Sequence, residues 1–422
     1  MKRIFLSCCL IVVLSSCTST KKTIQKGLSS TLSTPFYENQ FTGVLFMDAT
    51  TKDTLFNQNS TKYFTPASNT KIFTLYTALN TLPDRIPALR YIRQNDTLFV
   101  QGTGDPSFLH PYLKDSTAFK FLQKEKNIAL STGNFQDSRF GPGWSWEDYD
   151  YYYSPERSGF PTYGNVVLLT NGTETPVVPE YFKDSVIPIA NKTNRKEHRN
   201  LFYFDAARTD TLEVPFKTSD TTLKAVLEKE LKTTITIVKE MPLGSKQTLY
   251  GIPADSLYVR LMHESDNFIA EQLLLLSASE TADTLQTQIA ITNTLDKLLP
   301  NLPQGPRWVD GSGLSRYNLF TPQSMVHVLE RLYVELPRER LFKIFPSGGV
   351  SGTLTDWYEG NSTPYIYAKS GSLGNNYCLS GYLLTNSGKT VIFSFMNNHF
   401  KHPSSEIKTS MQQLFEKIRD TY

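Results

Sequence analysis

The chain has 422 residues, with 43 lysines and arginines against 40 aspartates and glutamates, so its formal net charge is only +3. A nearly neutral chain lacks the strongly basic surface that nucleic-acid or acidic-membrane binding requires, and we expect no nucleic-acid partner. At this length one hydrophobic core is not expected, and two or three domains are predicted.

The first 16 residues have the pattern of an export signal. Lys2 and Arg3 precede the apolar run Ile4–Leu14, which is too short to span a bilayer as a mature helix. The run ends in Leu14-Ser15-Ser16-Cys17, which resembles a bacterial lipobox and implies cleavage before Cys17 and lipidation of that residue. An ordinary signal peptide with an incidental cysteine is the alternative. We therefore expect an exported periplasmic lipoprotein, anchored to the inner or outer membrane only through its lipid.

The number of cysteines limits which disulfides and metal sites the mature chain can form. Cys8 and Cys9 would leave with the signal and Cys17 would carry lipid, so only Cys378 is left. A single thiol permits no intrachain disulfide and no cysteine-based metal site. Because no histidine/carboxylate cluster has metal-ligand spacing either, we expect no metal and no cofactor.

The first part of the mature chain leads into two strands and a helix. Residues 17–34 are rich in serine, threonine and lysine, which predicts a flexible tether. Two strands, Thr42–Asp48 and Thr54–Phe56, are predicted next, joined by a polar turn. A proline and small polar residues then precede the apolar run Ile72–Leu79, which predicts a buried helix starting near Ser68.

The predicted secondary structure becomes less regular between residues 91 and 249. Short predicted strands alternate there with loops and with two helical segments, Thr117–Glu125 and Thr221–Leu231. We interpret residues 91–249 as an inserted, β-rich accessory region of one or two small subdomains. Residues 35–90 and 250–422 would then form one discontinuous domain.

The insertion contains an unusual stretch, Gly141–Tyr153, called the aromatic loop from here on. Carboxylates alternate in it with tryptophans and tyrosines. Such a composition suits recognition of ammonium groups or of sugar faces. A tightly packed Gly/Pro loop whose aromatic rings only pack would give the same pattern.

The last part of the chain has clear periodicity. Its predicted elements are, in order, a helix over Leu257–Leu276, a helix over Pro322–Glu335, a strand over Ile366–Leu373, a hairpin of Tyr377–Thr385 with Thr390–Asn397, and a helix from Ser404. The last helix has one apolar face, made of Ile407, Met411, Leu414, Phe415 and Ile418. That face predicts a helix packed on a sheet.

Ser68 and Lys71 are a candidate nucleophile and base. They are three residues apart, so on a helix they share one face. Free N–H groups at a helix start stabilise negative charge, and an amine kept neutral one turn away can deprotonate a hydroxyl. Taken alone, the pair is equally well explained by a serine near a helix start and a surface lysine.

Two further motifs follow Ser68 and Lys71 along the chain: Ser265-Asp266-Asn267 and Lys369-Ser370-Gly371. The three together are the signature of penicillin-binding proteins and class A β-lactamases. With the glycine-punctuated loop Asp310–Arg316 and the aromatic loop, the sequence resembles the class C low-molecular-mass penicillin-binding proteins. This is the D-alanyl-D-alanine carboxypeptidase/endopeptidase family, also called peptidase family S13. The resemblance covers nearly all of the mature chain.

The resemblance implies a fold and an activity. The fold would be α+β, a β-lactamase/transpeptidase-like domain in which an antiparallel sheet is flanked by helices, with the insertion between the first two motifs. The activity would be that of a serine-type D-Ala-D-Ala carboxypeptidase, with possible endopeptidase activity, on peptidoglycan stem peptides. β-Lactams would be covalent inhibitors.

The same resemblance implies catalytic roles. Ser68 would attack the carbonyl and form an acyl-enzyme. Lys71 would be the base, kept neutral by burial and by a second cation, Lys369. Ser265 would pass a proton to the departing amine, and Asn267 would bond the substrate amide and orient Lys71.

Further residues would hold the substrate. Lys369 would attract its terminal carboxylate, which the hydroxyls of Ser370 and Ser372 on either side of Gly371 would grip. The backbone N–H groups of Ser68 and Ser372 would form the oxyanion hole. The family usually has threonine at position 370, so the loss of a methyl group is expected to change affinity and not chemistry.

The resemblance also gives candidates for binding the third residue of the stem peptide: Asp148, Tyr153, Leu314 and Arg316. An acid and an arginine suit a group with both an ammonium and a carboxylate, such as the free end of meso-diaminopimelate. Gly374 stands where some relatives carry a polar side chain, so part of that subsite is expected to be missing.

Other functions fit less well. A Ser-His-Asp hydrolase requires a Gly-x-Ser-x-Gly elbow and a suitable histidine, whereas His263 is expected to pack or cap, and Asp266 to cap its helix. A serine β-lactamase shares the three motifs, but no clear counterpart of its deacylating base is present. A non-catalytic cell-wall-binding lipoprotein is the third alternative, and it would not need this intact set of motifs.

Overall fold

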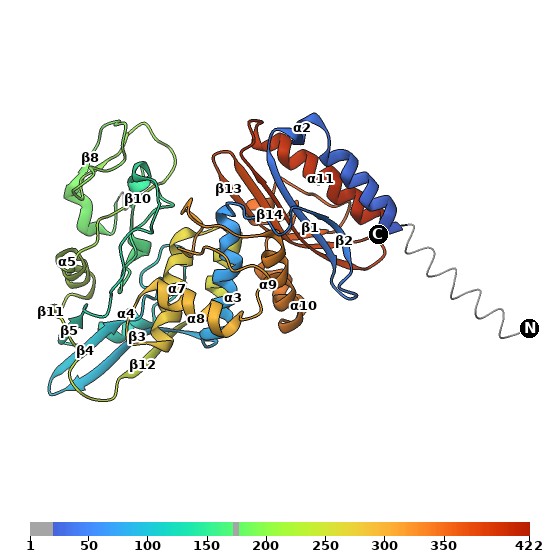
Figure 1. The fold of residues 1–422 in the computed structure, drawn as a ribbon. Coiled ribbons are helices and arrows are strands. Elements are labelled where there is room, and N and C mark those ends of the chain that lie inside the picture. Colours follow the sequence, from blue (N-terminus) through green and yellow to red (C-terminus); the bar gives the residue numbers. More distant parts are fainter. Residues whose placement is uncertain (1–19, 172–176) are drawn as a thin grey trace, which may run out of the picture.

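The computed structural model describes residues 20–171 and 177–422. The expected signal peptide, residues 1–16, and the expected lipid-bearing Cys17 lie outside the described residues. Figure 1 shows a body that contains both ends of the described chain, and beside it the region formed by the middle of the sequence.

The body is built on a five-stranded antiparallel sheet with strand order β13-β14-β15-β1-β2. Its strands are β1 (Phe41–Asp48), β2 (Thr54–Gln58), β13 (Ile366–Leu373), β14 (Asn376–Leu384) and β15 (Thr390–Asn398). The pairing of β1 with β15 joins the start of the domain to its end, and it leaves β13 as an edge strand (Figure 1).

The two faces of this sheet bury separate cores because side chains alternate along a strand. Val44 and Phe46 of β1 pack in the core under α11 (Ser404–Thr421), whereas Leu45 belongs to the core on the opposite face. The predicted apolar face of α11 is buried throughout. On the opposite face α9 (Pro322–Glu335) packs on the sheet, and α3 (Lys71–Thr81) contributes to the same core.

Residues 20–32 form a helix that runs alongside α11 (Figure 1). Ile24, Leu28 and Leu32 are buried in the core shared with α11. The flexible tether expected over residues 17–34 is therefore wrong for these residues. Apolar side chains four apart lie on one face of a helix, and that stripe outweighs the polar composition around it.

The long helix expected over Leu257–Leu276 is in fact two helices, which is a second correction. α6 (Ala254–His263) ends before the second motif, and α7 (Asn267–Thr281) begins inside it. Between them Ser265 has a φ of 54°, in the left-handed region that a continuing helix does not use. The remaining elements of the body are α2 (Pro35–Glu38), α8 (Thr287–Asn293), the π-helix η5 (Thr294–Leu298), α10 (Arg338–Ile344) and the 3-10 turn η6 (Gly352–Leu354).

The inserted region is larger at both ends than expected. Its main sheet has the order β11-β5-β4-β3-β12, with β3 (Arg85–Gln94), β4 (Thr97–Gly102), β5 (Asn127–Ser131), β11 (Thr234–Val238) and β12 (Gln247–Pro253), and its helices are α4 (Thr117–Leu122) and α5 (Asp220–Leu231). The expected boundaries at 90/91 and 249/250 fall inside β3 and β12. These two strands pair with each other, so the insertion begins near residue 85 and ends near residue 253.

A smaller unit is built on this sheet. It contains a three-stranded sheet of order β10-β6-β7 and the short pair β8-β9. Its elements are η3 (Tyr163–Asn165), β6 (Val166–Leu169), β7 (Val177–Val178), η4 (Glu180–Ser185), β8 (Val186–Ile187), β9 (Phe202–Tyr203) and β10 (Leu212–Pro215). In the inserted region, the five-stranded and the three-stranded sheet each have a hydrophobic cluster of their own.

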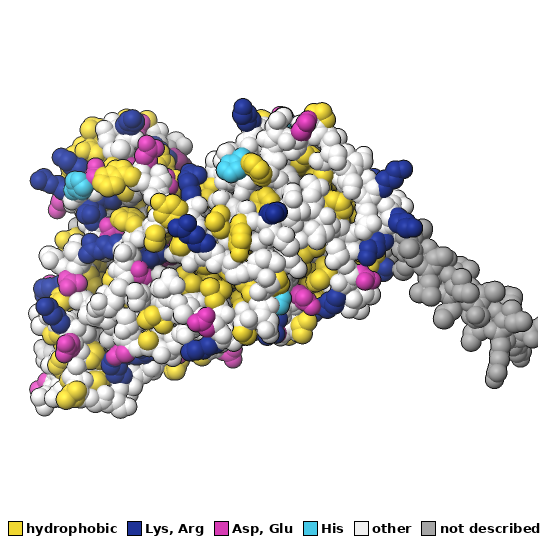
Figure 2. Space-filling view, in the orientation of Figure 1, with side chains coloured by type: hydrophobic (Ala, Val, Ile, Leu, Met, Phe, Trp, Pro, Cys, Tyr) yellow, Lys and Arg dark blue, Asp and Glu magenta, His cyan; other side chains and the backbone are white. Residues whose placement is uncertain are grey.

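The surface carries charges of both signs. On the face drawn in Figure 2, lysines and arginines are interspersed with aspartates and glutamates. Within residues 20–171 and 177–422, no helix is both long and apolar enough to cross a membrane.

Candidate active site

Ser68 lies in the 3-10 turn η1 (Ala67–Thr70), which leads directly into α3. The hydroxyl of Thr70 donates to Ala67 O at 2.9 Å and closes the turn. Asn69 donates to Lys369 O at 2.8 Å, which holds the turn against the edge strand β13. The predicted helix is therefore present, with the serine in the tight turn before its first residue.

Lys71 is completely buried behind Ser68. Its ammonium nitrogen, Nζ, lies 3.0 Å from Ser68 Oγ, 2.6 Å from Asn267 Oδ1 and 2.6 Å from Ser312 O. Burial lowers the pKa of Lys71 from 10.5 to about 8, and nearby carboxylates, led by Asp310, oppose the shift. The amine is therefore far easier to deprotonate than an ordinary lysine.

The second motif is displayed by the break between α6 and α7. Asp266 caps α7 by accepting a hydrogen bond from Ile269 N at 3.0 Å, and it accepts another from Arg260 Nε at 2.9 Å, as the expected capping role requires. Asn267 accepts from Lys71 through its oxygen and donates to Tyr153 O at 2.9 Å. Ser265 adopts a positive φ at the break between the two helices, and it lines the same cleft as Ser68.

The third motif belongs to β13, which is held against the Ser68 turn. Lys369 is completely buried and donates to Ser370 O at 2.8 Å. Burial, with a further contribution from the charge of Lys71, holds the pKa of Lys369 well below its usual value. A Cβ atom on Gly371 would lie 2.6 Å from Pro66 O and 2.9 Å from Ser68 N, so only glycine allows this close approach.

A cleft of about 940 Å³ gathers most of the predicted residues. The predicted residues that line it are Ser68, Ser265, Asn267, Ser372, Asp148, Tyr153, Leu314, Arg316 and Gly374. Lys71, Lys369, Ser370 and Gly371 are not among the lining residues and lie in the wall behind it. His263 is also outside the lining, and its Nε2 lies 3.1 Å from Lys343 O.

The aromatic loop forms one side of this cleft. The Tyr153 hydroxyl donates to Asp148 Oδ1 at 2.9 Å, and the Tyr153 carbonyl accepts from Asn267. The loop is therefore attached directly to the second motif. Arg316 is an exposed residue of the same lining.

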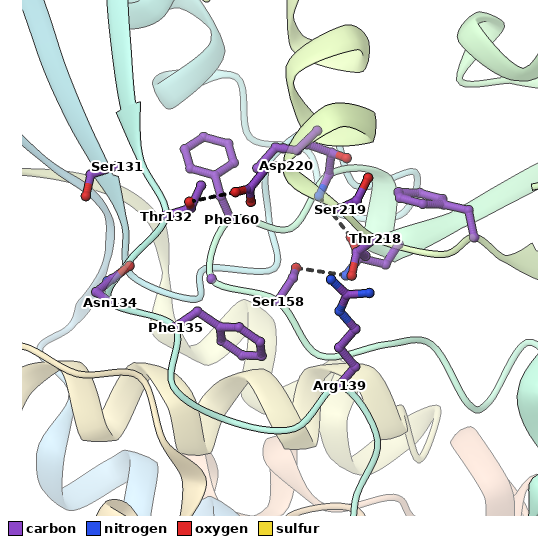
Figure 3. Close-up of a pocket in the computed structure, with 15 residues that line it drawn as sticks. Ser131, Thr132, Asn134, Phe135, Arg139, Ser158, Phe160, Thr218, Ser219 and Asp220 are labelled. Carbon is purple, nitrogen blue, oxygen red and sulfur yellow. Dashed lines mark hydrogen bonds between the residues drawn. The ribbon is translucent and has the colours of Figure 1, made fainter. Parts of the chain in front are cut away.

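A second cavity, shown in Figure 3, lies in the insertion and has a volume of only about 80 Å³. Its polar side chains largely bind one another: Thr132 donates to Asp220 at 3.1 Å, and Asn165 donates to Ser158 at 2.9 Å. It contains no residue of the three motifs. The 940 Å³ cleft is therefore the candidate active site.

Comparison with known proteins agrees with this arrangement. The profile of the family described as "D-Ala-D-Ala carboxypeptidase 3 (S13) family" matches residues 24–418. The chain belongs to the S13 family. Membership confirms the family and the class of enzyme expected from the three motifs.

Individual S13 relatives are distant. A "Penicillin-sensitive carboxypeptidase A" of Dictyostelium discoideum is 23% identical over 85% of this chain and 83% of its own length. The "D-alanyl-D-alanine carboxypeptidase DacB" of Haemophilus influenzae is 32% identical, over 40% of this chain and 37% of that relative. The crystal structure of penicillin binding protein 4 (dacB) from H. influenzae superposes with a TM-score of 0.73 at 22% identity, covering 92% of this chain and 98% of that one. This likeness confirms the expected fold class.

Some residues of this S13 site were not predicted from the sequence. Ser312 accepts a hydrogen bond from Lys71 through its carbonyl oxygen, which any residue type could supply. Thr353 lines the cleft and accepts a hydrogen bond from Ser370 at 2.7 Å. The only sequence signal for Thr353 is the glycine-rich stretch 348–352 before it.

A buried network supports the lysine. Arg157 of the insertion donates two hydrogen bonds to Glu271 of α7, at 2.9 and 2.6 Å, and both side chains are buried. The other oxygen of Glu271 accepts from Ser312 N at 2.7 Å. The network therefore fixes the Ser312 carbonyl that binds Lys71.

Proposed function

We propose that this S13 enzyme hydrolyses the D-Ala-D-Ala bond of peptidoglycan stem peptides through an acyl-enzyme on Ser68. The observation that carries the proposal is the 3.0 Å contact between Ser68 Oγ and the buried, weakly basic amine of Lys71. A neutral Lys71 takes the hydroxyl proton as Ser68 attacks the carbonyl of the penultimate residue.

The negative charge that develops on the carbonyl oxygen is stabilised by the backbone N–H groups of Ser68 and Ser372. The close approach that Gly371 permits between β13 and the Ser68 turn supports this pairing. Ser265 then delivers a proton to the departing D-alanine, which leaves an ester on Ser68 that water hydrolyses.

The leaving residue's carboxylate binds to the hydroxyls of Ser370 and Ser372. Lys369 is buried and donates to a backbone carbonyl, so it does not contact the carboxylate directly, and in its protonated form it attracts the carboxylate from the wall behind the cleft. In the structure the Ser370 hydroxyl donates to Thr353, so it turns from Thr353 to donate to the carboxylate, and the Thr353 hydroxyl can then donate to Ser370 in return. The third residue of the stem peptide binds between Asp148 and Arg316, where groups of opposite charge suit an amino acid carrying both an ammonium and a carboxylate.

Changing Ser68 to alanine tests the mechanism. Purified wild-type protein should release D-alanine from a pentapeptide ending in D-Ala-D-Ala and should be labelled covalently by a fluorescent penicillin. Ser68→Ala should abolish labelling and lower D-alanine release by at least about a thousandfold. Labelling that survives in the variant removes Ser68 from the mechanism, and rapid turnover of the penicillin indicates a β-lactamase instead.

We further propose that the enzyme acts outside the cytoplasm as a lipoprotein attached through Cys17. The pattern of residues 1–17 supports this proposal, as does a substrate that lies outside the cytoplasm. Mass spectrometry of protein purified from membranes should find a diacylglyceryl group on Cys17. Replacement of Cys17 by serine should release the protein into the soluble exported fraction.

A further inference from the structure

The aromatic loop lines a second hollow besides the active-site cleft. This hollow, the side pocket, has a volume of about 320 Å³, and its walls include Trp144, Trp146, Tyr149, Glu156 and Lys217. Ser145 lines both the cleft and the side pocket, so the two spaces adjoin.

The short helix in the loop explains how one segment serves two spaces. Trp146 to Asp150 form the 3-10 helix η2, in which residues three apart lie on the same side. Trp146 and Tyr149 accordingly line the side pocket, whereas Glu147 and Asp148 line the cleft. A ligand that leaves the cleft past Asp148 therefore meets aromatic rings next.

The aromatic walls are held rigidly. The indole N–H of Trp144 donates to Asp310 Oδ2 at 2.8 Å, and the guanidinium of Arg157 lies 5.4 Å from the centre of its ring. Arg195 lies 5.2 Å from the ring of Tyr149 and donates to the Tyr149 carbonyl at 3.2 Å. Flat surfaces fixed before binding lose little entropy when a ligand stacks on them.

Trp146 is different, because 71% of its surface is exposed. A tryptophan that contributes its ring to a pocket wall while leaving most of it in water suits the binding of an apolar face. Trp146 is not part of any hydrophobic core that the described residues form, so packing does not explain why a tryptophan stands at this position.

The polar groups of the side pocket favour an uncharged, hydroxyl-rich ligand. Glu156 is buried and accepts from Thr218 N and Oγ at 2.8 and 2.6 Å through one oxygen, while its other oxygen has no hydrogen-bond partner among the described residues. Lys217 Nζ is 3.9 Å from that second oxygen. Groups of both signs beside aromatic faces match a sugar ring, whose C–H face stacks and whose hydroxyls donate and accept.

We propose that the side pocket binds a pyranose ring of the peptidoglycan glycan strand, the N-acetylated amino sugar to which the stem peptide is attached. This inference rests on the proposed function, because it takes the peptide to run from Ser68 past Asp148. The sugar, covalently linked to the first residue of that peptide, then reaches Trp146 and Tyr149.

The first experiment compares two substrates. One is the disaccharide N-acetylglucosaminyl-N-acetylmuramyl pentapeptide ending in D-Ala-D-Ala, and the other is the same pentapeptide without sugar. Wild-type kcat/KM should be about three- to tenfold higher for the sugar-bearing substrate, as expected for one good ring contact. Trp146→Ala should bring the ratio of the two values to about 1, and this ratio cancels any general loss of activity.

Tyr250→Ala is the matched control, because Tyr250 is also an exposed aromatic residue but lines neither space. It should keep the wild-type ratio. Equal cleavage of both substrates by wild-type protein, or an unchanged ratio in Trp146→Ala, overturns the sugar site and leaves the proposed function intact.

A second experiment does not depend on cleavage. Saturation-transfer NMR with the peptide-free disaccharide should give a signal from its N-acetyl methyl groups with Ser68→Ala protein and none when Trp146→Ala is added. If neither substrate is cleaved, the proposed function fails, and this measurement alone decides the sugar site. Absence of the signal from both proteins contradicts the sugar site.

Discussion

At the scale of single residues, the chemistry depends on Lys71 being buried without a carboxylate in direct contact with its amine. Three oxygen or hydroxyl partners surround its nitrogen, yet none of them is a carboxylate. Carboxylates are present only at longer range, so they oppose the desolvation without cancelling it. The result is an amine that can act as a base close to neutral pH.

The pH profile should reflect this amine. Only neutral Lys71 can accept the proton of Ser68, so kcat/KM for the pentapeptide should rise with pH, reach half of its maximum near pH 8, the value to which the pKa is lowered, and level off above it. Well below that pH the rate should fall about tenfold per pH unit. Steady-state rates between pH 5 and 9.5 measure the profile.

Lys71→Arg is the matched control, because a guanidinium keeps its proton throughout this range. The variant should be nearly inactive at every pH. A wild-type midpoint that stays in the variant would assign the titration to another group.

At the scale of elements, the site depends on how closely β13 approaches the Ser68 turn. Gly371→Ala places a methyl group against Pro66 O and Ser68 N, which are backbone atoms that cannot rotate away. A displacement of about 1 Å at a catalytic centre costs about a hundredfold in rate, so kcat/KM should fall at least that far.

Gly305→Ala is the control for this prediction, since a Cβ atom at Gly305 meets nothing within 4 Å. Its rate and penicillin labelling should equal those of the wild type. Gly371→Ala protein with normal acylation would show that the strand and the turn can separate without loss.

The helix formed by residues 20–32 belongs to the same scale. Leu28→Ala removes a fully buried side chain and should lower the free energy of unfolding by about 2–5 kcal/mol. Lys26→Ala, on the exposed side of that helix, should change it by less than about 0.5 kcal/mol. Urea unfolding followed by circular dichroism distinguishes a packed helix from a tether, for which both changes would be neutral.

Elements with an unbroken pattern could be predicted from the sequence, and elements set by distant contacts could not. The buried face of α11 follows from a period of 3.6, and β13 has the bounds that were predicted for it, Ile366–Leu373. At Ser265 the apolar pattern continues on both sides, and the local sign of the break is the capping residue Asp266. The pairing of β3 with β12, which sets the true limits of the insertion, is invisible in either segment alone.

The candidate site divides in the same way. Ser68, Lys71, Asn267 and Lys369 could be assigned because their chemistry resides in side chains at motif positions. Ser312 and Tyr153 contribute backbone carbonyl oxygens, which every residue type has, so the sequence does not indicate them.

At the scale of the whole molecule, one buried ion pair joins the insertion to the catalytic helices. Arg157→Leu would leave Glu271 without its cation in the interior, where the carboxylate must stay charged or take up a proton, and this should cost about 3–5 kcal/mol of unfolding free energy. Urea unfolding of the whole chain measures the loss.

Arg93→Leu provides the comparison, because about half of the Arg93 side chain is exposed in its pair with Glu125, whereas Arg157 is buried. Its cost should be within about 1 kcal/mol. Equal costs for the two variants would mean that the buried pair does not hold the two parts together.

The hydrogen bond from Asn69 to the carbonyl of Lys369 spans 300 positions of sequence. Ribosomes make the nucleophile early and its docking strand late, so a nascent or truncated polypeptide carries the serine without the means to use it. Reactivity therefore appears only once synthesis is nearly finished, and fragments cut short before β13 should be unable to form an acyl-enzyme.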